Sequence, residues 1–175
     1  MTSIKKNLLV TGGAGFIGSN FINYIYKKYP NYNIRLLDAL TYAGNLDNIS
    51  NNLKSNGHFQ FSHGNVTQPD IVNQLVSDSD IVVHFAAESH VTRSIYDNSL
   101  FFETDVIGTQ VIANAIVNHP VERFIHISSS EVYGTALNSP MNEDHPLNPM
   151  SPYAAAKAGA DRLVYSYVHT YGLPA

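Results

Sequence analysis

The sequence contains no cysteine. The chain therefore has no disulfide scaffold, thiolate zinc site or catalytic thiol, although this absence says little about its compartment. Charged residues are also scarce, at 14% of 175 residues, and the formal net charge is −4 with only 10 lysines and arginines. Such a chain offers no basic surface for nucleic acid or for an anionic membrane, so we expect neither partner.

Long hydrophobic runs are missing as well. No stretch of about 18 consecutive apolar residues occurs, and the N-terminal MTSIKKN leads into the first apolar run without a secretory leader. Hydrophobic residues still make up 44% of the chain, which suits a globular domain with a core of its own. We therefore expect a single soluble, cytoplasmic domain over residues 1–175.

Five apolar runs are present, and they indicate the fold class. They end at Thr11, Asp38, Ser62, Phe85 and Ser128, with enough chain between each pair for a helix. The runs LLV, IVVHF and FIHI are almost continuously apolar, which is typical of parallel strands covered on both faces. The pattern predicts an α/β protein with a doubly wound, mostly parallel sheet (a Rossmann fold), whose ligands bind at the carboxyl ends of the strands.

The first run continues into a glycine-rich turn, LLVTGGAGFIGSN over residues 8–20. Gly12, Gly15 and Gly18 follow strand-like residues and precede a segment with helical periodicity. Glycine tolerates positive φ and holds no side chain against a ligand, and the first N–H groups of a helix attract anions. The order of strand, glycines and helix predicts a phosphate-binding turn.

The second run ends in an acidic residue, Asp38, 20 residues after Gly18. A dinucleotide-binding βαβ unit needs an acid at this point to accept hydrogen bonds from the adenosine ribose. A carboxylate also repels a 2′-phosphate, and the neighbouring Ala39 provides no cation to bind one. The sequence therefore predicts NAD rather than NADP as the cofactor.

A second group of polar residues lies near the fifth run. Tyr153 and Lys157 are four residues apart in a predicted helix, so one face carries both, and the ammonium can make the phenol a base near neutral pH. They follow three serines, 128–130, whose hydroxyls suit a substrate alcohol. Tyr24 and Lys28 have the same spacing but lie near the end of the first helix, so we interpret that pair as structural.

The eight histidines show no spacing typical of a metal site, and we expect no bound metal. His84 and His126 lie in apolar strands and are interpreted as satisfied core residues. Glu88 is either a second acid or a strand-end carboxylate.

Several segments together resemble the dTDP-glucose 4,6-dehydratases of the extended short-chain dehydrogenase/reductase family. The resemblance covers the whole chain, and its most specific pieces are TYAGNL and AESHV, with FFETDVIGT and SEVYG beside them. It implies that Ser89 and His90 lie near the sugar, and that a homodimer forms in the full-length form. It also implies an NAD site made by Gly12, Gly15, Phe16, Ile17, Gly18, Asp38, Thr41, Asn65, Val66, Ala86, Ala87, Thr104, Tyr153 and Lys157.

The same resemblance implies the catalytic residues Ser129, Ser130, Glu131, Tyr153 and Lys157. At Ser130 the dehydratases have an aspartate that protonates the departing hydroxyl, and where this chain has Asp105 they have an asparagine. GDP-mannose 4,6-dehydratases and UDP-glucuronate decarboxylases carry a similar Ser-Glu pair, so nucleotide-sugar chemistry does not depend on that aspartate.

The implied activity is dehydration of a nucleotide sugar, dTDP-glucose to dTDP-4-keto-6-deoxyglucose, by oxidation, water elimination and hydride return through bound NAD. Three alternatives stay open: a nucleotide-sugar 4-epimerase, a UDP-glucuronate decarboxylase-like enzyme, and a catalytically silent NAD-binding fragment. The final GLPA stands where the resembled family continues with further strands. We therefore expect a chain truncated before the last strands and the substrate-binding region.

Overall fold

The structure, a computed structural model, describes residues 5–175. Residues 1–4 lie outside the described residues, and so does that part of the N-terminal segment MTSIKKN for which the sequence predicted no secretory leader. Its centre is one five-stranded sheet with the order β3-β2-β1-β4-β5, in which all neighbours are parallel. The strands are β1 (Asn7–Thr11), β2 (Asn33–Asp38), β3 (Phe59–His63), β4 (Ile81–His84) and β5 (Arg123–His126). The predicted doubly wound parallel sheet is confirmed.

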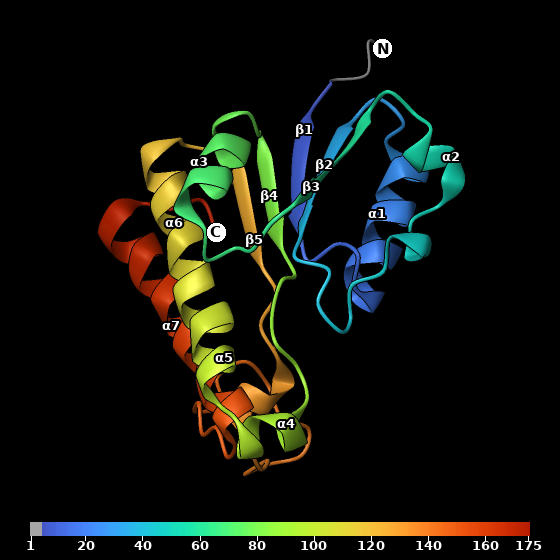
Figure 1. Cartoon of the computed structure of the whole chain (residues 1–175). Coiled ribbons are helices and arrows are strands. Elements are labelled where there is room, and N and C mark those ends of the chain that lie inside the picture. Colours follow the sequence, from blue (N-terminus) through green and yellow to red (C-terminus); the bar gives the residue numbers. More distant parts are fainter. Residues whose placement is uncertain (1–4) are drawn as a thin grey trace.

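Helices cover both faces of the sheet (Figure 1). One face packs against α1 and α2, and the other against α3, α6 and α7. The helical segments are α1 (Phe16–Lys28), a 3-10 turn (Leu46–Asn48), α2 (Asn51–Lys54), α3 (Pro69–Ser77), α4 (Val91–Tyr96), α5 (Ser99–Phe101), a π-helical turn (Phe102–Ile107), α6 (Gly108–Asn118), a second 3-10 turn (Ser130–Tyr133) and α7 (Pro152–Tyr171).

Each strand contributes to two cores because successive side chains point to opposite faces of a sheet. In β1, Leu8 and Val10 pack into the core beneath α1 and α2, whereas Leu9 packs into the core beneath α3, α6 and α7. All three side chains are essentially inaccessible to solvent. Burial on both faces explains why the strands are apolar almost without interruption.

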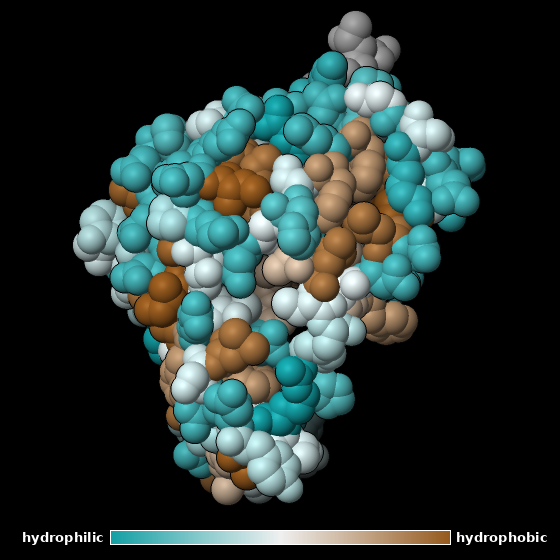
Figure 2. Space-filling model, in the orientation of Figure 1, coloured by the Kyte–Doolittle hydropathy of each residue, from teal (hydrophilic) through white to brown (hydrophobic). Residues whose placement is uncertain are grey.

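The segments α5, the π-helical turn and α6 form one continuous helix, Ser99–Asn118. Within residues 5–175, it is the one helix long and apolar enough to cross a membrane by length and composition alone. Here it packs between α3 and α7 against the sheet, as a core helix does. Figure 2 shows several apolar groups on the viewed face, one of them an elongated band in the upper right, with polar side chains between and around them.

Three strands end at slightly different residues from those predicted. The predicted ends at Ser62, Phe85 and Ser128 become His63, His84 and His126. At β5 the reason is visible, because the carbonyl oxygen of Ile127 accepts a hydrogen bond from Lys157 Nζ. The chain therefore leaves the ladder at the point where the catalytic candidates begin.

Candidate functional site

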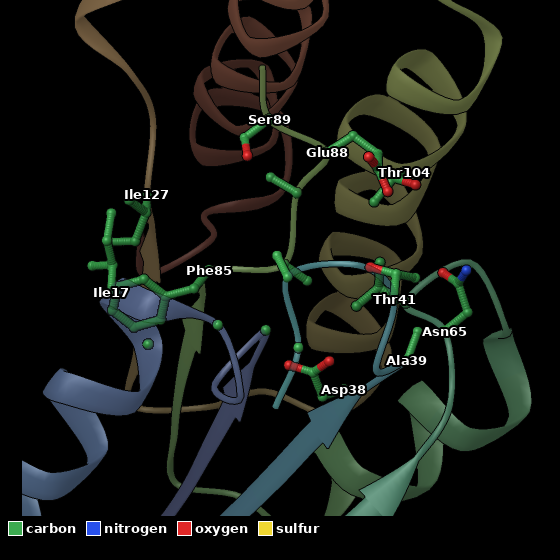
Figure 3. A pocket seen from close by; sticks show the side chains of 18 of the residues that line it. Ile17, Asp38, Ala39, Thr41, Asn65, Phe85, Glu88, Ser89, Thr104 and Ile127 are labelled. Carbon is green, nitrogen blue, oxygen red and sulfur yellow. The ribbon is translucent and has the colours of Figure 1, made fainter. Parts of the chain in front are cut away.

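A cavity of about 380 Å³ opens at the carboxyl ends of the strands. Every residue that the resemblance assigned to the NAD site lines it, and Ser89 and Ser128 line it as well. Figure 3 shows Asp38 at the tip of β2, with Glu88, Ser89 and Thr104 on the opposite side of the cavity. The site thus lies where an open parallel sheet is expected to bind its ligand.

The glycine turn after β1 has no room for side chains at two of its positions. Gly12 adopts φ +69°, and a Cβ there would lie 2.4 Å from the backbone nitrogen of Ala86. A Cβ on Gly18 would lie 2.5 Å from the carbonyl oxygen of Gly12. The turn therefore packs its backbone directly against the chain after β4 and against the start of α1, whose first residues line the cavity. The first N–H groups of a helix have no partner within it and suit an anion.

We expect Gly12→Ala to destabilise the fold by about 2–4 kcal/mol, which combines positive-φ strain with a backbone clash. Gly172→Ala is the first control, because Gly172 also has φ +69° but its Cβ would meet nothing within 4 Å. It should cost only about 1 kcal/mol. Gly57→Ala, with open space and no positive φ, should be nearly neutral. Urea unfolding measures all three, and equal losses at positions 12 and 172 would contradict the clash.

Asp38 lies at one end of the cavity and is only 9% exposed. Its Oδ2 accepts the backbone N–H of Ala14 at 2.9 Å, and its Oδ1 accepts that of Leu40 at 2.8 Å. These bonds fix the carboxylate between the glycine turn and the loop after β2. Each oxygen keeps a free lone pair, so the group can still accept hydroxyl donors from a ribose.

Tyr153 and Lys157, in the first turns of α7, line the same cavity from beside β5, which two strands separate from β2 and Asp38. The helix begins sharply because Ser151 Oγ accepts the N–H of Ala154 and Pro152 occupies the first turn. Lys157 is 4% exposed, and its Nζ donates to the carbonyl oxygen of Ile127 at 2.8 Å. Burial lowers the pKa of Lys157, while Asp105 and Asp161 oppose that shift.

The second Tyr-Lys pair lies elsewhere. Tyr24 is 57% exposed on α1, and Lys28 Nζ lies 5.4 Å from the centre of its ring. Neither residue lines the cavity. The two pairs therefore have the same spacing in the sequence but lie in different environments. Substitution of Tyr24 is a matched control for substitution of Tyr153.

The remaining catalytic candidates lie next to the cavity and do not line it. Ser129 directly follows Ser128 and caps the 3-10 turn, which begins with Ser130 and Glu131; Ser129 Oγ accepts the N–H of Glu131 at 3.2 Å. The Glu131 side chain is exposed. His90 is also exposed and outside the lining, and it adopts φ 92° where α4 begins.

One polar group beside the cavity was not foreseen. The Tyr42 hydroxyl lies 3.0 Å from both the carbonyl oxygen and Oγ of Ser89, and the Arg93 guanidinium lies 3.9 Å from the centre of the Tyr42 ring. Arg93 Nη1 is 3.5 Å from Glu88 Oε2. The group links the loop after β2 to the loop after β4 and to α4. Tyr42, Glu88 and Ser89 lie in the motifs TYAGNL and AESHV, but nothing in the sequence indicated that these residues contact one another.

The two strand histidines differ. His84 is buried, and its ring lies between the hydroxyls of Thr11, at 2.6 Å, and Thr109, at 3.0 Å, as expected of a satisfied core residue. The ring nitrogens of His126 are buried without a hydrogen-bond partner, so that part of the expectation is wrong. Burial lowers the pKa of His126 to about 4. Among residues 5–175, no three His, Asp or Glu side chains are grouped to hold a metal ion.

The fold and the site together define a dinucleotide-binding domain of the extended short-chain dehydrogenase/reductase class. The chain belongs to the GDP-mannose 4,6 dehydratase family, whose model matches residues 9–175. The low-salt glycan biosynthesis protein Agl12 of Haloferax volcanii is 47% identical over 168 residues, which are 96% of this chain and 54% of that protein.

Solved structures give the same assignment. The dTDP-glucose 4,6-dehydratase DesIV from Streptomyces venezuelae, with NAD and TYD bound, is 44% identical with a TM-score of 0.89, over 95% of this chain and 53% of that one. A UDP-N-acetylglucosamine 4-epimerase from Methanobrevibacter ruminantium is 29% identical with a TM-score of 0.89, over 97% and 52%. The chain thus spans about half the length of the relatives it matches.

Proposed function

We propose that this chain is the NAD-binding and catalytic part of a nucleotide-sugar 4,6-dehydratase that converts dTDP-glucose to dTDP-4-keto-6-deoxyglucose. One observation carries the proposal: Tyr153 and Lys157 of α7 line the same cavity as Asp38, and they reach it beside the end of β5, whereas Asp38 lies at the end of β2. A dinucleotide in this cavity would have the base Tyr153 and the buried cation Lys157 near one half and the ribose acceptor Asp38 near the other. The sequence identity to DesIV supports the choice of reaction.

The described residues fit NAD. The glycine turn leaves its backbone open where a pyrophosphate needs close approach, and Asp38 keeps acceptor capacity for the adenosine ribose. Lys157 Nζ makes one hydrogen bond in the structure, so it has donors left for a nicotinamide ribose. When bound, NAD would supply the hydride acceptor for carbon 4 of the sugar and the hydride donor for carbon 6.

In the oxidation, Tyr153 would take the proton of the hydroxyl on carbon 4. The Lys157 ammonium, buried and held by Ile127, stabilises the tyrosinate that this step requires. Ser129 would orient the same hydroxyl from the end of β5. Ser129 follows the cavity-lining Ser128 in the chain and caps the 3-10 turn that begins at Ser130.

In the elimination, Glu131 would remove the proton from carbon 5, which the new ketone makes acidic. Ser130, or a water that it holds, would protonate the hydroxyl leaving carbon 6. Both residues lie in the 3-10 turn beside the cavity, and both are exposed, so a bound sugar can reach them.

A 4-epimerase is the second candidate, because the epimerase and dehydratase structures match this fold with equal TM-scores. An epimerase needs Tyr153 and Lys157 but no carboxylate at position 131, so Glu131 favours the dehydratase.

The proposed dehydration is tested with a joined protein, in which this chain replaces the matching part of DesIV. Mass spectrometry of the product from dTDP-glucose should show a nucleotide sugar that has lost one water. Unchanged mass would contradict the proposal.

Asp38 should make the chain select NAD over NADP by at least ~10²-fold, because a buried carboxylate facing a 2′-phosphate costs several kcal/mol. Asp38→Ala removes the charge and should bring the two affinities to within about tenfold of each other. Titration calorimetry with each nucleotide measures the ratio. Equal affinities in the unaltered chain, or an unchanged preference in the variant, would contradict the role given to Asp38.

We further propose, from the resemblance, a homodimer in the full-length form with a nucleotide sugar as ligand. From the composition and charge of the sequence we propose a cytoplasmic protein with neither nucleic acid nor a membrane as partner. Sedimentation of the joined protein tests the dimer, and a monomer would contradict it.

A further inference from the structure

A buried carboxyl group lies directly behind the wall of the cavity, on the π-helical turn. Asp105 is 1% exposed, and its Oδ1 accepts the backbone N–H of Glu88 at 2.7 Å. Its Oδ2 is buried and has no hydrogen-bond partner. Glu88 and Thr104, the residue before Asp105, both line the cavity, and Figure 3 shows both on the side opposite Asp38. Asp105, which carries the unsatisfied oxygen, therefore directly follows a cavity-lining residue in the chain and bonds the backbone of another.

Charged groups face Asp105 from each element packed against it. From the loop after β4 comes Glu88, whose Oε2 is buried and lies 3.5 Å from Arg93 of α4. From α7 comes Lys157, which within residues 5–175 forms no ion pair. On the core side, Thr109 Oγ1 donates to the Asp105 carbonyl oxygen and bonds His84, whose pKa burial holds well below its ordinary value. His84 is therefore neutral.

These surroundings let Asp105 change its charge near neutral pH. Burial raises the pKa of Asp105 to about 7, with Lys157 and the Glu88 N–H opposing the shift and the Glu88 carboxylate adding to it. Burial also raises the pKa of Glu88, and Arg93 opposes that shift. Asp105 is thus a buried group, facing Lys157 beside the cavity, whose charge a nearby positive charge can switch.

We propose that Asp105 is a positioning residue whose carboxylate favours the oxidised, positively charged nicotinamide ring over the reduced, neutral ring. The inference rests on the proposed function, in which NAD binds with that ring at the Tyr153–Lys157 end. The only bond that forms or breaks at Asp105 is the O–H bond of its carboxyl group. The carboxylate takes a proton from solvent when the positive charge of the ring is lost, and returns the proton when the charge is restored. The charge of this end of the cavity then stays constant while the cofactor is reduced and reoxidised.

The test compares the Kd values of NAD and NADH for the 175-residue chain between pH 5.5 and pH 8.5. Preference for NAD should rise by ~10-fold between pH 6 and pH 8, the change that accompanies a one-unit shift in the pKa of Asp105. The adenosine half is common to both nucleotides, so titrations at that end cancel in the ratio. Asp105→Asn keeps an acceptor for the Glu88 N–H but cannot ionise, and its ratio should not vary with pH.

Two controls accompany the variant. His63→Gln removes an exposed histidine near Ala39, at the Asp38 end of the cavity, and should keep the pH trend. Asp105→Asn should also be at least as stable as the unaltered chain at pH 8. The folded pKa of Asp105 lies above its ordinary value of 3.8, so a charged Asp105 lowers stability as pH rises above that value.

A ratio that is constant with pH in the unaltered chain, or a trend that survives in Asp105→Asn, would overturn this inference while leaving the proposed function intact. A chain that binds neither nucleotide would overturn both.

Discussion

A Glu131→Gln variant of the joined protein should still transfer hydride from carbon 4 of the sugar, yet release product at least ~10²-fold more slowly. Glutamine keeps the size and hydrogen bonding of Glu131 but cannot accept the proton from carbon 5. Oxidation would therefore proceed and elimination would stall. Single-turnover absorbance of the reduced nicotinamide reports the first step, and the 4-keto-6-deoxy product reports the second.

The matched control for this variant is Glu143→Gln. Glu143 is also an exposed glutamate, but it lies in the loop before α7 and outside the cavity lining, so both steps should keep their rates. If Glu131→Gln makes product at the unaltered rate, Glu131 is a structural acid that follows β5. The epimerase would then become the better hypothesis.

Tyr153→Phe should have the opposite effect and slow the first hydride transfer by ~10²- to 10⁴-fold. Phenylalanine keeps the ring, which meets Phe101 edge-on at 6.2 Å, and removes the hydroxyl of a residue that lines the cavity together with the buried Lys157. The variant should fold and bind NAD, because the N–H of residue 153 still donates to Ser94 Oγ. Stopped-flow absorbance in the joined protein measures the transfer.

Tyr24→Phe tests whether spacing or position matters. Tyr24 and Lys28 have the same spacing in the sequence as Tyr153 and Lys157, but Tyr24 is exposed on α1. Its substitution should leave hydride transfer unchanged within experimental error. Equal losses from the two variants would contradict the assignment of the base to Tyr153.

The sheet and both ends of the cavity could be predicted because each depends on local pattern. Near-continuous apolar runs specify buried parallel strands, and the carboxyl ends of such strands meet at one edge. Asp38 therefore had to face the glycine turn, and the cap formed by Ser151 and Pro152 fixed where α7 begins. Helical spacing then placed Tyr153 and Lys157 on one face.

The polar groups behind the cavity could not be predicted, because they depend on tertiary packing. The π-helical turn has no signature in its own sequence, yet it turns Asp105 toward the N–H of Glu88. The contact between Arg93 and Tyr42 joins residues that are far apart in the chain. The sequence marked Asp105 only as an acid at a position where the resembled family has asparagine.

The most direct test of the central claim follows one hydrogen. The joined protein is given dTDP-glucose with deuterium on carbon 4, and the product is analysed by nuclear magnetic resonance. A dehydratase that keeps its cofactor bound should deliver the deuterium to carbon 6 of a 4-keto-6-deoxy sugar. Deuterium returned to carbon 4, in a sugar that retains its oxygen on carbon 6, would contradict the account.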